Sequence, residues 1–129
     1  MNRCGILVGA ALLLVGCGPA FESVAALNAE PDDALCAGYQ QAAYFNARGR
    51  MSLIRQEISR RGLVPAREWP VIAHGHIEIG MSRCGMLAAW GLPDRVNHVA
   101  TRFAQTDQYV FGPNLVYIEN GVVDGIQQF

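Results

Sequence analysis

The stretch QYVFGPNLVYIENGVVDGIQ, residues 108–127, decides the fold. It is rich in β-branched and aromatic residues with a period of two, which is typical of β-strands. Turn signals interrupt it at Gly112-Pro113-Asn114 and at Asn120-Gly121, and an Asn-Gly pair between apolar runs is the strongest short-range signal for a hairpin. We therefore predict an antiparallel meander of three or four strands over residues 96–103, 108–111, 115–119 and 122–127.

Helical patterns come before this meander. Apolar residues recur at helical spacing over residues 34–62, and Arg60-Arg61-Gly62 has the composition of a helix end. Asp32 or Asp33 is the predicted cap at the start of this helical region. Gly49 predicts either a kink or a division into two helices.

A shorter helix is predicted from its cap, Ser82, to Gly91, with Pro93 preventing continuation. Residues 63–78, which precede it, are predicted to be mostly irregular. One face of the short helix is apolar and is predicted to be buried, with Met81, Cys84, Leu87 and Ala88 on it. Helices followed by antiparallel strands predict an α+β domain over residues 34–129, with the helices on one face of the sheet.

The charge balance excludes one class of partner. The 129 residues include ten basic and eleven acidic side chains, so the formal net charge is −1. Nucleic-acid-binding proteins usually carry a basic surface, and we therefore expect no nucleic-acid partner. Among the charged residues, Glu57 precedes Arg60 and Arg61 by three and four positions, which predicts ion pairs on a solvated helix face.

The N-terminal residues predict the destination of the chain. Residues 1–16 contain one positive charge, Arg3, followed by the uncharged apolar run from Ile6 to Val15. This is the pattern of a secretory signal peptide. The run is shorter than the roughly 20 apolar residues that a membrane-spanning helix needs.

The end of this segment, Leu14-Val15-Gly16-Cys17, resembles the lipobox of bacterial lipoproteins. The resemblance implies cleavage before Cys17, a thioether-linked diacylglycerol on its sulfur and acylation of the new N-terminus. Gly18 stands where inner-membrane lipoproteins often carry Asp, which implies the outer membrane, with the domain facing the periplasm. Residues 17–33 are predicted to be the lipidated cysteine and a flexible tether.

Motifs in the C-terminal half resemble the SmpA/OmlA (BamE-like) domain family of small bacterial outer-membrane lipoproteins. These are Ile79-Gly80-Met81-Ser82, Trp90-Gly91-Leu92-Pro93, Tyr109-Val110-Phe111 and Val116-Tyr117-Ile118-Glu119-Asn120-Gly121-Val122. The resemblance covers residues 77–127. It implies a helix packed on a meander, and, as partners, other envelope proteins such as the subunits that assemble β-barrel proteins.

Two cysteines are predicted to form a disulfide. Cys4 leaves with the signal peptide and Cys17 carries the lipid, so Cys36 and Cys84 remain in an oxidising compartment. A bridge between them would join the start of the long helical region to the short helix. Two independent buried thiols are the alternative.

The sequence offers few candidates for chemistry. His74 and His76, with Glu78, would lie on one face of an extended segment, an arrangement that zinc uses, but incidental histidines in an exposed loop are the alternative. Nothing in the sequence fixes the remaining ligand, so no metal and no other cofactor is predicted. Motifs for a nucleophile with its base or for a phosphate-binding loop are also missing, and we predict that the protein is not an enzyme.

Binding is therefore the predicted activity. Tyr109, Phe111 and Tyr117 are the candidate partner-binding residues, with core packing as the alternative. We expect a lipid-anchored envelope protein that binds other envelope proteins, in outer-membrane barrel assembly or envelope integrity. An inhibitor-like binding module of a secreted or periplasmic enzyme is the second hypothesis, and a small enzyme or metal carrier centred on His74 and His76 is the third.

The lipobox resemblance predicts that Cys17 carries lipid. The full chain should incorporate radiolabelled fatty acid, whereas Cys17→Ala should not, because the thioether then has no sulfur to form on. Cys4→Ala is the matched control and should be labelled like the original chain. A chain that takes up no label and fractionates as soluble would contradict the anchor.

Overall fold

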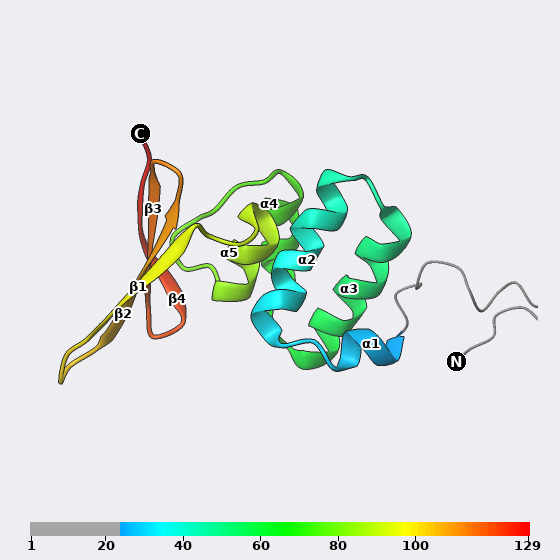
Figure 1. Ribbon diagram of the computed structural model, residues 1–129, viewed down its shortest axis with the longest axis horizontal. Coiled ribbons are helices and arrows are strands. Elements are labelled where there is room, and N and C mark those ends of the chain that lie inside the picture. The colour runs from blue at the N-terminus through cyan, green and yellow to red at the C-terminus, as the bar shows by residue number, and fades with distance from the viewer. Residues whose placement is uncertain (1–23) are drawn as a thin grey trace, which may run out of the picture.

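The computed structural model describes residues 24–129 (Figure 1), so the predicted signal peptide and Cys17 lie outside the described residues. The helices are α1 (Val24–Asn28), α2 (Asp32–Tyr44), α3 (Arg48–Arg61), the 3₁₀ helix η2 (Ala66–Glu68), α4 (Trp69–Ala73) and α5 (Arg83–Trp90). The strands are β1 (Arg95–Ala100), β2 (Gln105–Phe111), β3 (Asn114–Glu119) and β4 (Val122–Gln127). This order confirms the predicted α+β class.

The four strands form one antiparallel sheet in the order β1-β2-β3-β4, as a meander requires. Asn120 and Gly121 both have positive φ, 52° and 83°, which is the conformation predicted for this pair in a hairpin turn. The first strand ends at Ala100, three residues earlier than predicted. Thr101 causes this end, because its N–H donates to the Ala104 carbonyl while its hydroxyl accepts from the Ala104 N–H.

The helices lie at one end of the molecule and pack against one face of the sheet through α5 (Figure 1). Their shared core includes the predicted face of α5, and the side chains of Cys84, Leu87 and Ala88 are buried in it. From the sheet, alternate residues complete this core, namely Tyr109, Val116, Ile118 and Val123. Ser82 caps α5 as predicted, since its hydroxyl accepts from the Gly85 N–H at 3.0 Å.

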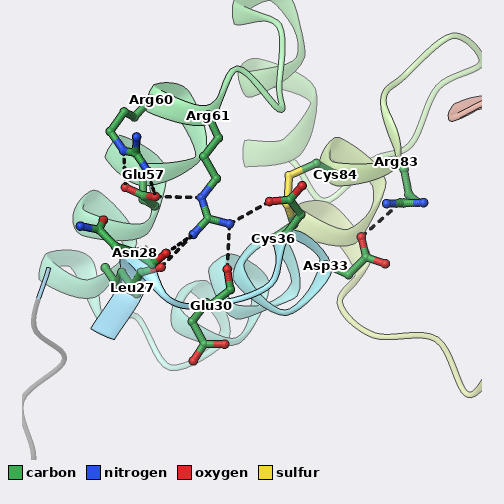
Figure 2. A network of polar contacts seen from close by, with 11 residues as sticks. Leu27, Asn28, Glu30, Asp33, Cys36, Glu57, Arg60, Arg61, Arg83 and Cys84 are labelled. Carbon is green, nitrogen blue, oxygen red and sulfur yellow. Dashed lines mark hydrogen bonds and ion pairs between the residues drawn. A yellow bond between two sulfur atoms is a disulfide. The ribbon is translucent and has the colours of Figure 1, made fainter. Parts of the chain in front are cut away.

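A disulfide joins Cys36 in α2 to Cys84 in α5, with 5.3 Å between their Cα atoms. The predicted pairing is therefore present. Both residues are buried, Cys36 completely. Since α2 and α5 come from distant parts of the chain, the bridge fixes the central pair of helices in the helical layer (Figure 2).

The helical region differs from the prediction in three ways. It does divide into two helices, but between Tyr44 and Arg48, because Asn46 adopts a left-handed conformation with φ of 54°, while Gly49 lies inside α3. No side chain caps α2. Residues 63–78 are less irregular than predicted, since η2 and α4 both form there.

The aspartates predicted as caps form ion pairs with distant arginines instead. Asp32 accepts from Arg61 at 2.8 Å, and Asp33 pairs with Arg83 at 3.1 Å. Each pair joins α2 to another helix, α3 in the first case and α5 in the second. Asp32 and Asp33 therefore connect α2 to other helices and do not cap α2 itself.

The Arg61 guanidinium binds the segment that was predicted to be a flexible tether (Figure 2). It donates at 2.8 to 3.2 Å to the carbonyl oxygens of Leu27, Asn28 and Glu30 and to the carboxylates of Asp32 and Glu57. Residues 24–28 form α1, and the side chain of Leu27 is buried in the core. The tether prediction is therefore wrong for the described residues from Val24 onward, because Arg61 and the core hold them.

The same contacts correct the prediction of a solvated charge pair. Glu57 is only 6% exposed, and its carboxylate accepts from both Arg60 and Arg61. These arginines lower the pKa of Glu57 from 4.5 to about 2, chiefly through their hydrogen bonds. Glu57 and Arg61 form the least exposed part of a polar network that reaches the α1 segment, a long-range arrangement that helical spacing alone does not reveal.

This network predicts acid sensitivity. The pKa of Glu57 is lower in the folded chain, about 2, than the ordinary 4.5, so its ionised form stabilises the fold above pH 4.5 and this contribution is lost as the pH falls toward 2. Urea unfolding from pH 6 to pH 2 should show a smaller loss of stability for Glu57→Gln than for the original chain. Glu78→Gln, at an exposed side chain, is the control and should keep the original pH dependence. Equal pH dependence for Glu57→Gln and the original chain would contradict the role of Glu57.

Candidate functional site

The three aromatic residues predicted to bind a partner do not share a surface. In the sheet register Tyr109 is opposite Val116 and Gln108 is opposite Tyr117, so Tyr109 and Tyr117 point to opposite faces. Tyr109 is 4% exposed in the core, and Phe111 packs edge-on against Trp90 with 5.3 Å between ring centroids. The structure thus assigns Tyr109 and Phe111 to the helix-covered face and leaves Tyr117 alone on the other.

The open face of the sheet carries Tyr117 in a row of polar side chains that crosses all four strands. Asn97 donates to Gln108 at 2.7 Å, Gln108 donates to the Tyr117 hydroxyl at 3.2 Å, and that hydroxyl donates to Gln127 at 3.3 Å. These groups satisfy one another. The row therefore offers a flat polar surface with its main hydrogen-bonding groups already engaged.

His74 and His76, the candidate metal ligands, are not joined by further ligands in the described residues. His74 follows α4, and its Nδ1 donates to the Pro70 carbonyl at 2.8 Å, while the His76 ring lies 6.2 Å from the His74 ring, measured between centroids. Within residues 24–129, no group of three or more histidine, cysteine or carboxylate side chains comes together to hold a metal ion. The histidines are therefore loop residues with local contacts.

The two edge strands of the sheet, β1 and β4, differ in the backbone hydrogen bonds that they make on their outer sides. Along β4, the chain that enters α5 runs beside the strand, with hydrogen bonds from Gly80 N–H to the Val123 carbonyl, from Val123 N–H to the Met81 carbonyl and from Arg83 N–H to the Gly121 carbonyl. Within the described residues, β1 has a paired neighbour only on its β2 side. In this part of the chain, the β4 edge is therefore covered at its start, at Val122 and Val123, and the β1 edge is open along its length.

A cavity of about 430 Å³ lies beneath this open edge, between the sheet and the helices. The strand residues that line it are Arg95, Val96, His98, Gln105, Asp107 and Tyr109, and the others are Asp33, Arg83, Leu87, Leu92 and Pro93. We call this cavity the β1 groove. It exists because the helices cover β3 and β4 more fully than β1, whose residues are mostly exposed.

Charges in the β1 groove are arranged in two pairs. Asp107 is 8% exposed and its carboxylate contacts the Nδ1 of His98, on the neighbouring strand, at 2.7 Å. On the helix side, Arg83 pairs with Asp33 at 3.1 Å. Both carboxylates of the groove wall are therefore partnered, and the apolar part of the lining is formed by Leu87, Leu92, Pro93 and Val96.

Tyr109 lies at the meeting point of these pairs. Burial raises the pKa of its hydroxyl, the positive charge of Arg83 lowers it, the carboxylates of Asp33 and Asp107 raise it, and a hydrogen bond with Arg83 lowers it. The net effect is a raised pKa, so the hydroxyl stays protonated and neutral at physiological pH. It provides a neutral polar group beside the apolar side chains of the groove.

The chemistry available in the β1 groove favours binding. An Asp–His pair such as Asp107 and His98 can orient an imidazole base, but the described residues that line the groove include no serine, threonine, cysteine or lysine to serve as a nucleophile. The groove combines an apolar patch with polar groups that are fixed by their partners, and ligand sites use both kinds of surface.

His98, Asp107 and Arg83 were not predicted as site residues. His98 and Asp107 are nine positions apart and come into contact only through the pairing of β1 with β2. Arg83 lies in the short helix, for which only a role in core packing was predicted. The period-two pattern was the available signal, because it places His98 on the same face of its strand as Val96.

Comparisons with known proteins add no identification. The chain matches no family model, no curated protein and no solved structure. In the part of the chain that the structure describes, none of the helices has the length and apolar character to cross a membrane.

The electrostatics of the β1 groove can be tested through Tyr109. Arg83→Met removes the positive charge and the hydrogen bond that lower the pKa of Tyr109, so this pKa should rise further. NMR titration of ring-labelled tyrosine measures the change, and Tyr117, on the opposite face, is the internal control. An unchanged or lower pKa of Tyr109 in the variant would contradict the arrangement.

Proposed function

We propose that this protein is a lipid-anchored, protein-binding module of the bacterial cell envelope that works with other envelope proteins in outer-membrane β-barrel assembly or envelope integrity. Its lipid is carried by Cys17 and its domain faces the periplasm from the outer membrane. Motifs that resemble the SmpA/OmlA family support this role.

One observation carries the binding function, namely the β1 groove beneath the open edge of the sheet. The cavity of about 430 Å³ falls within the range of ordinary ligand sites. Its rim includes Leu92, whose side chain is 68% exposed although apolar. An exposed apolar residue beside a cavity and an unpaired strand is the type of surface that a partner protein covers.

The disulfide supports the location. Bridges such as Cys36–Cys84 form and persist in oxidising compartments, of which the bacterial periplasm is one, and are rare in the reducing cytosol. A buried bridge between two central helices fits a domain that folds after export.

The test is co-purification from detergent-solubilised envelopes, using the full chain and two variants. Leu92→Glu places a charge on the rim of the β1 groove and should reduce partner recovery at least fivefold. Ile79→Glu makes the same change at a side chain of similar exposure, 62% against 68%, that does not line the groove, and should retain the partner. Recovery of barrel-assembly or other envelope proteins that depends on Leu92 supports the proposal, and recovery unaffected by Leu92→Glu contradicts it.

A second candidate, an inhibitor-like module, has one specific observation in its favour. The turn between β1 and β2 projects away from the helices (Figure 1), and Phe103 at this tip is 86% exposed with the Arg102 guanidinium 5.4 Å from its ring centroid. A protruding aromatic tip can enter the cleft of an enzyme. In the same co-purification, a hydrolase that is lost with Phe103→Ser and kept with Leu92→Glu would favour this candidate.

A further inference from the structure

We infer that the partner binds as an extended segment, which pairs with β1 as a fifth strand of the sheet and inserts alternate apolar side chains into the β1 groove. This inference rests on the proposed function and specifies how the partner is recognised. Three observations carry it, namely the direction of the β1 backbone groups, the open β1 edge and the lining of the groove beneath that edge.

Within residues 24–129, the backbone of β1 has hydrogen-bonding groups without a strand partner on its open side. Thr101 N–H donates to the Ala104 carbonyl, and the register from Arg95 to Ala100 continues from this pair without a shift. In an antiparallel ladder, hydrogen-bonded pairs recur at every second residue, so Val99, Asn97 and Arg95 bond to β2. The N–H and C=O groups of Val96, His98 and Ala100 therefore point outward, where a further strand would bond to them.

The open edge carries few of the features that usually protect edge strands. Proteins block such edges with proline, charged side chains, bulges or a covering segment. The sequence of β1, RVNHVA, contains neither proline nor lysine, its register with β2 is regular from Arg95 to Ala100, and Arg95 is its one arginine. At the opposite edge residues 80–83 cover the start of β4, whereas β1 is open along its length within the described residues and lies above a cavity, so this edge is suited to accept a strand.

The β1 groove determines which side chains the added strand carries. In a strand added beside β1, every second side chain would point to the same face of the sheet as Val96 and His98. These two residues line the β1 groove, so the added side chains would point into it. The opposite wall has an apolar part, formed by Leu87, Leu92 and Pro93, beside the Asp33–Arg83 pair, and the two acidic groups of the groove are already paired. The segment that fits is therefore one of alternating apolar and polar residues, the pattern of a β-strand with one buried face.

A second copy of this chain fits the site less well. Paired edge to edge, the second β1 would offer the groove its own Val96, His98 and Ala100, of which Ala100 is small and His98 is polar. These side chains would leave much of a 430 Å³ cavity unfilled. Larger apolar side chains from a different protein fill it better.

The probe for this inference is an eight-residue peptide that alternates phenylalanine or leucine with threonine or serine, labelled with fluorescein. Its binding to the full chain in detergent micelles is measured by fluorescence anisotropy. Ala100→Pro removes an outward N–H without removing a bond to β2, and should weaken binding about tenfold. Ala100→Thr keeps that N–H and should bind like the original chain.

Two further measurements make the result independent of any folding defect in Ala100→Pro. A peptide with N-methyl groups on the alternate amides that would face β1 cannot pair, and should bind the original chain at least tenfold more weakly. On addition of the unmodified peptide, NMR should show slower amide exchange at Val96, His98 and Ala100, with little change at Asn97 and Val99.

The possible results distinguish strand addition from the alternatives. Equal affinity for both peptides, or no slowing of exchange at these three amides, would overturn strand addition. Slowing that depends on protein concentration without peptide would overturn it in favour of a second copy. Peptide binding without recovery of envelope proteins would contradict only the proposed function, whereas envelope partners retained by Ala100→Pro would contradict only strand addition.

Discussion

The disulfide between Cys36 and Cys84 is the constraint on which the remaining structure depends. It joins α2 to α5 across a sequence separation of 48 residues, and closing a loop of that size restricts the unfolded chain by about 4 kcal/mol in the chain-entropy model. The other helices and the sheet assemble around this pair, with α3 on α2 and both α4 and β4 on α5. The ion pair of Asp33 and Arg83 lies beside the bridge, so the helix wall of the β1 groove is fixed by the same covalent link.

The parts of the fold that could be predicted are those with local causes. The hairpin at Asn120-Gly121 and the cap at Ser82 depend on the conformational preferences of a few adjacent residues, and both are present. The break near Asn46 could not be found in this way, because a left-handed asparagine has no distinct signature within a helical pattern. The packing of residues 24–33 against Arg61 could not be predicted either. Arg61 lies about 30 positions away in the sequence, and no local pattern indicates which carbonyl and carboxylate oxygens accept its hydrogen bonds.

The candidate site could be predicted only in part, because it depends on which face each strand residue occupies. Counting outward from the predicted three-residue turn, Gly112-Pro113-Asn114, pairs Tyr109 with Tyr117 on one face. The turn has only two residues because Asn114 begins β3, so Gln108 pairs with Tyr117 and the two tyrosines lie on opposite faces. The turn after β1 carries no such signal, and without it the pairing of His98 with Asp107 cannot be counted. The cavity itself results from incomplete covering of β1 by the helices, a property of packing that no pattern along the chain records.

The docking of α1 by Arg61 also sets a geometric limit on a chain anchored at Cys17 as proposed. Residues 18–23 separate that cysteine from α1, and they span at most about 25 Å when fully extended. The helical end of the domain would then stay close to the bilayer surface, while the sheet, at the opposite end of the molecule (Figure 1), would be directed into the aqueous compartment. In this way Arg61 would determine the orientation of the open strand edge. The short connecting segment would let the domain rotate about its anchor but would keep its distance from the membrane small.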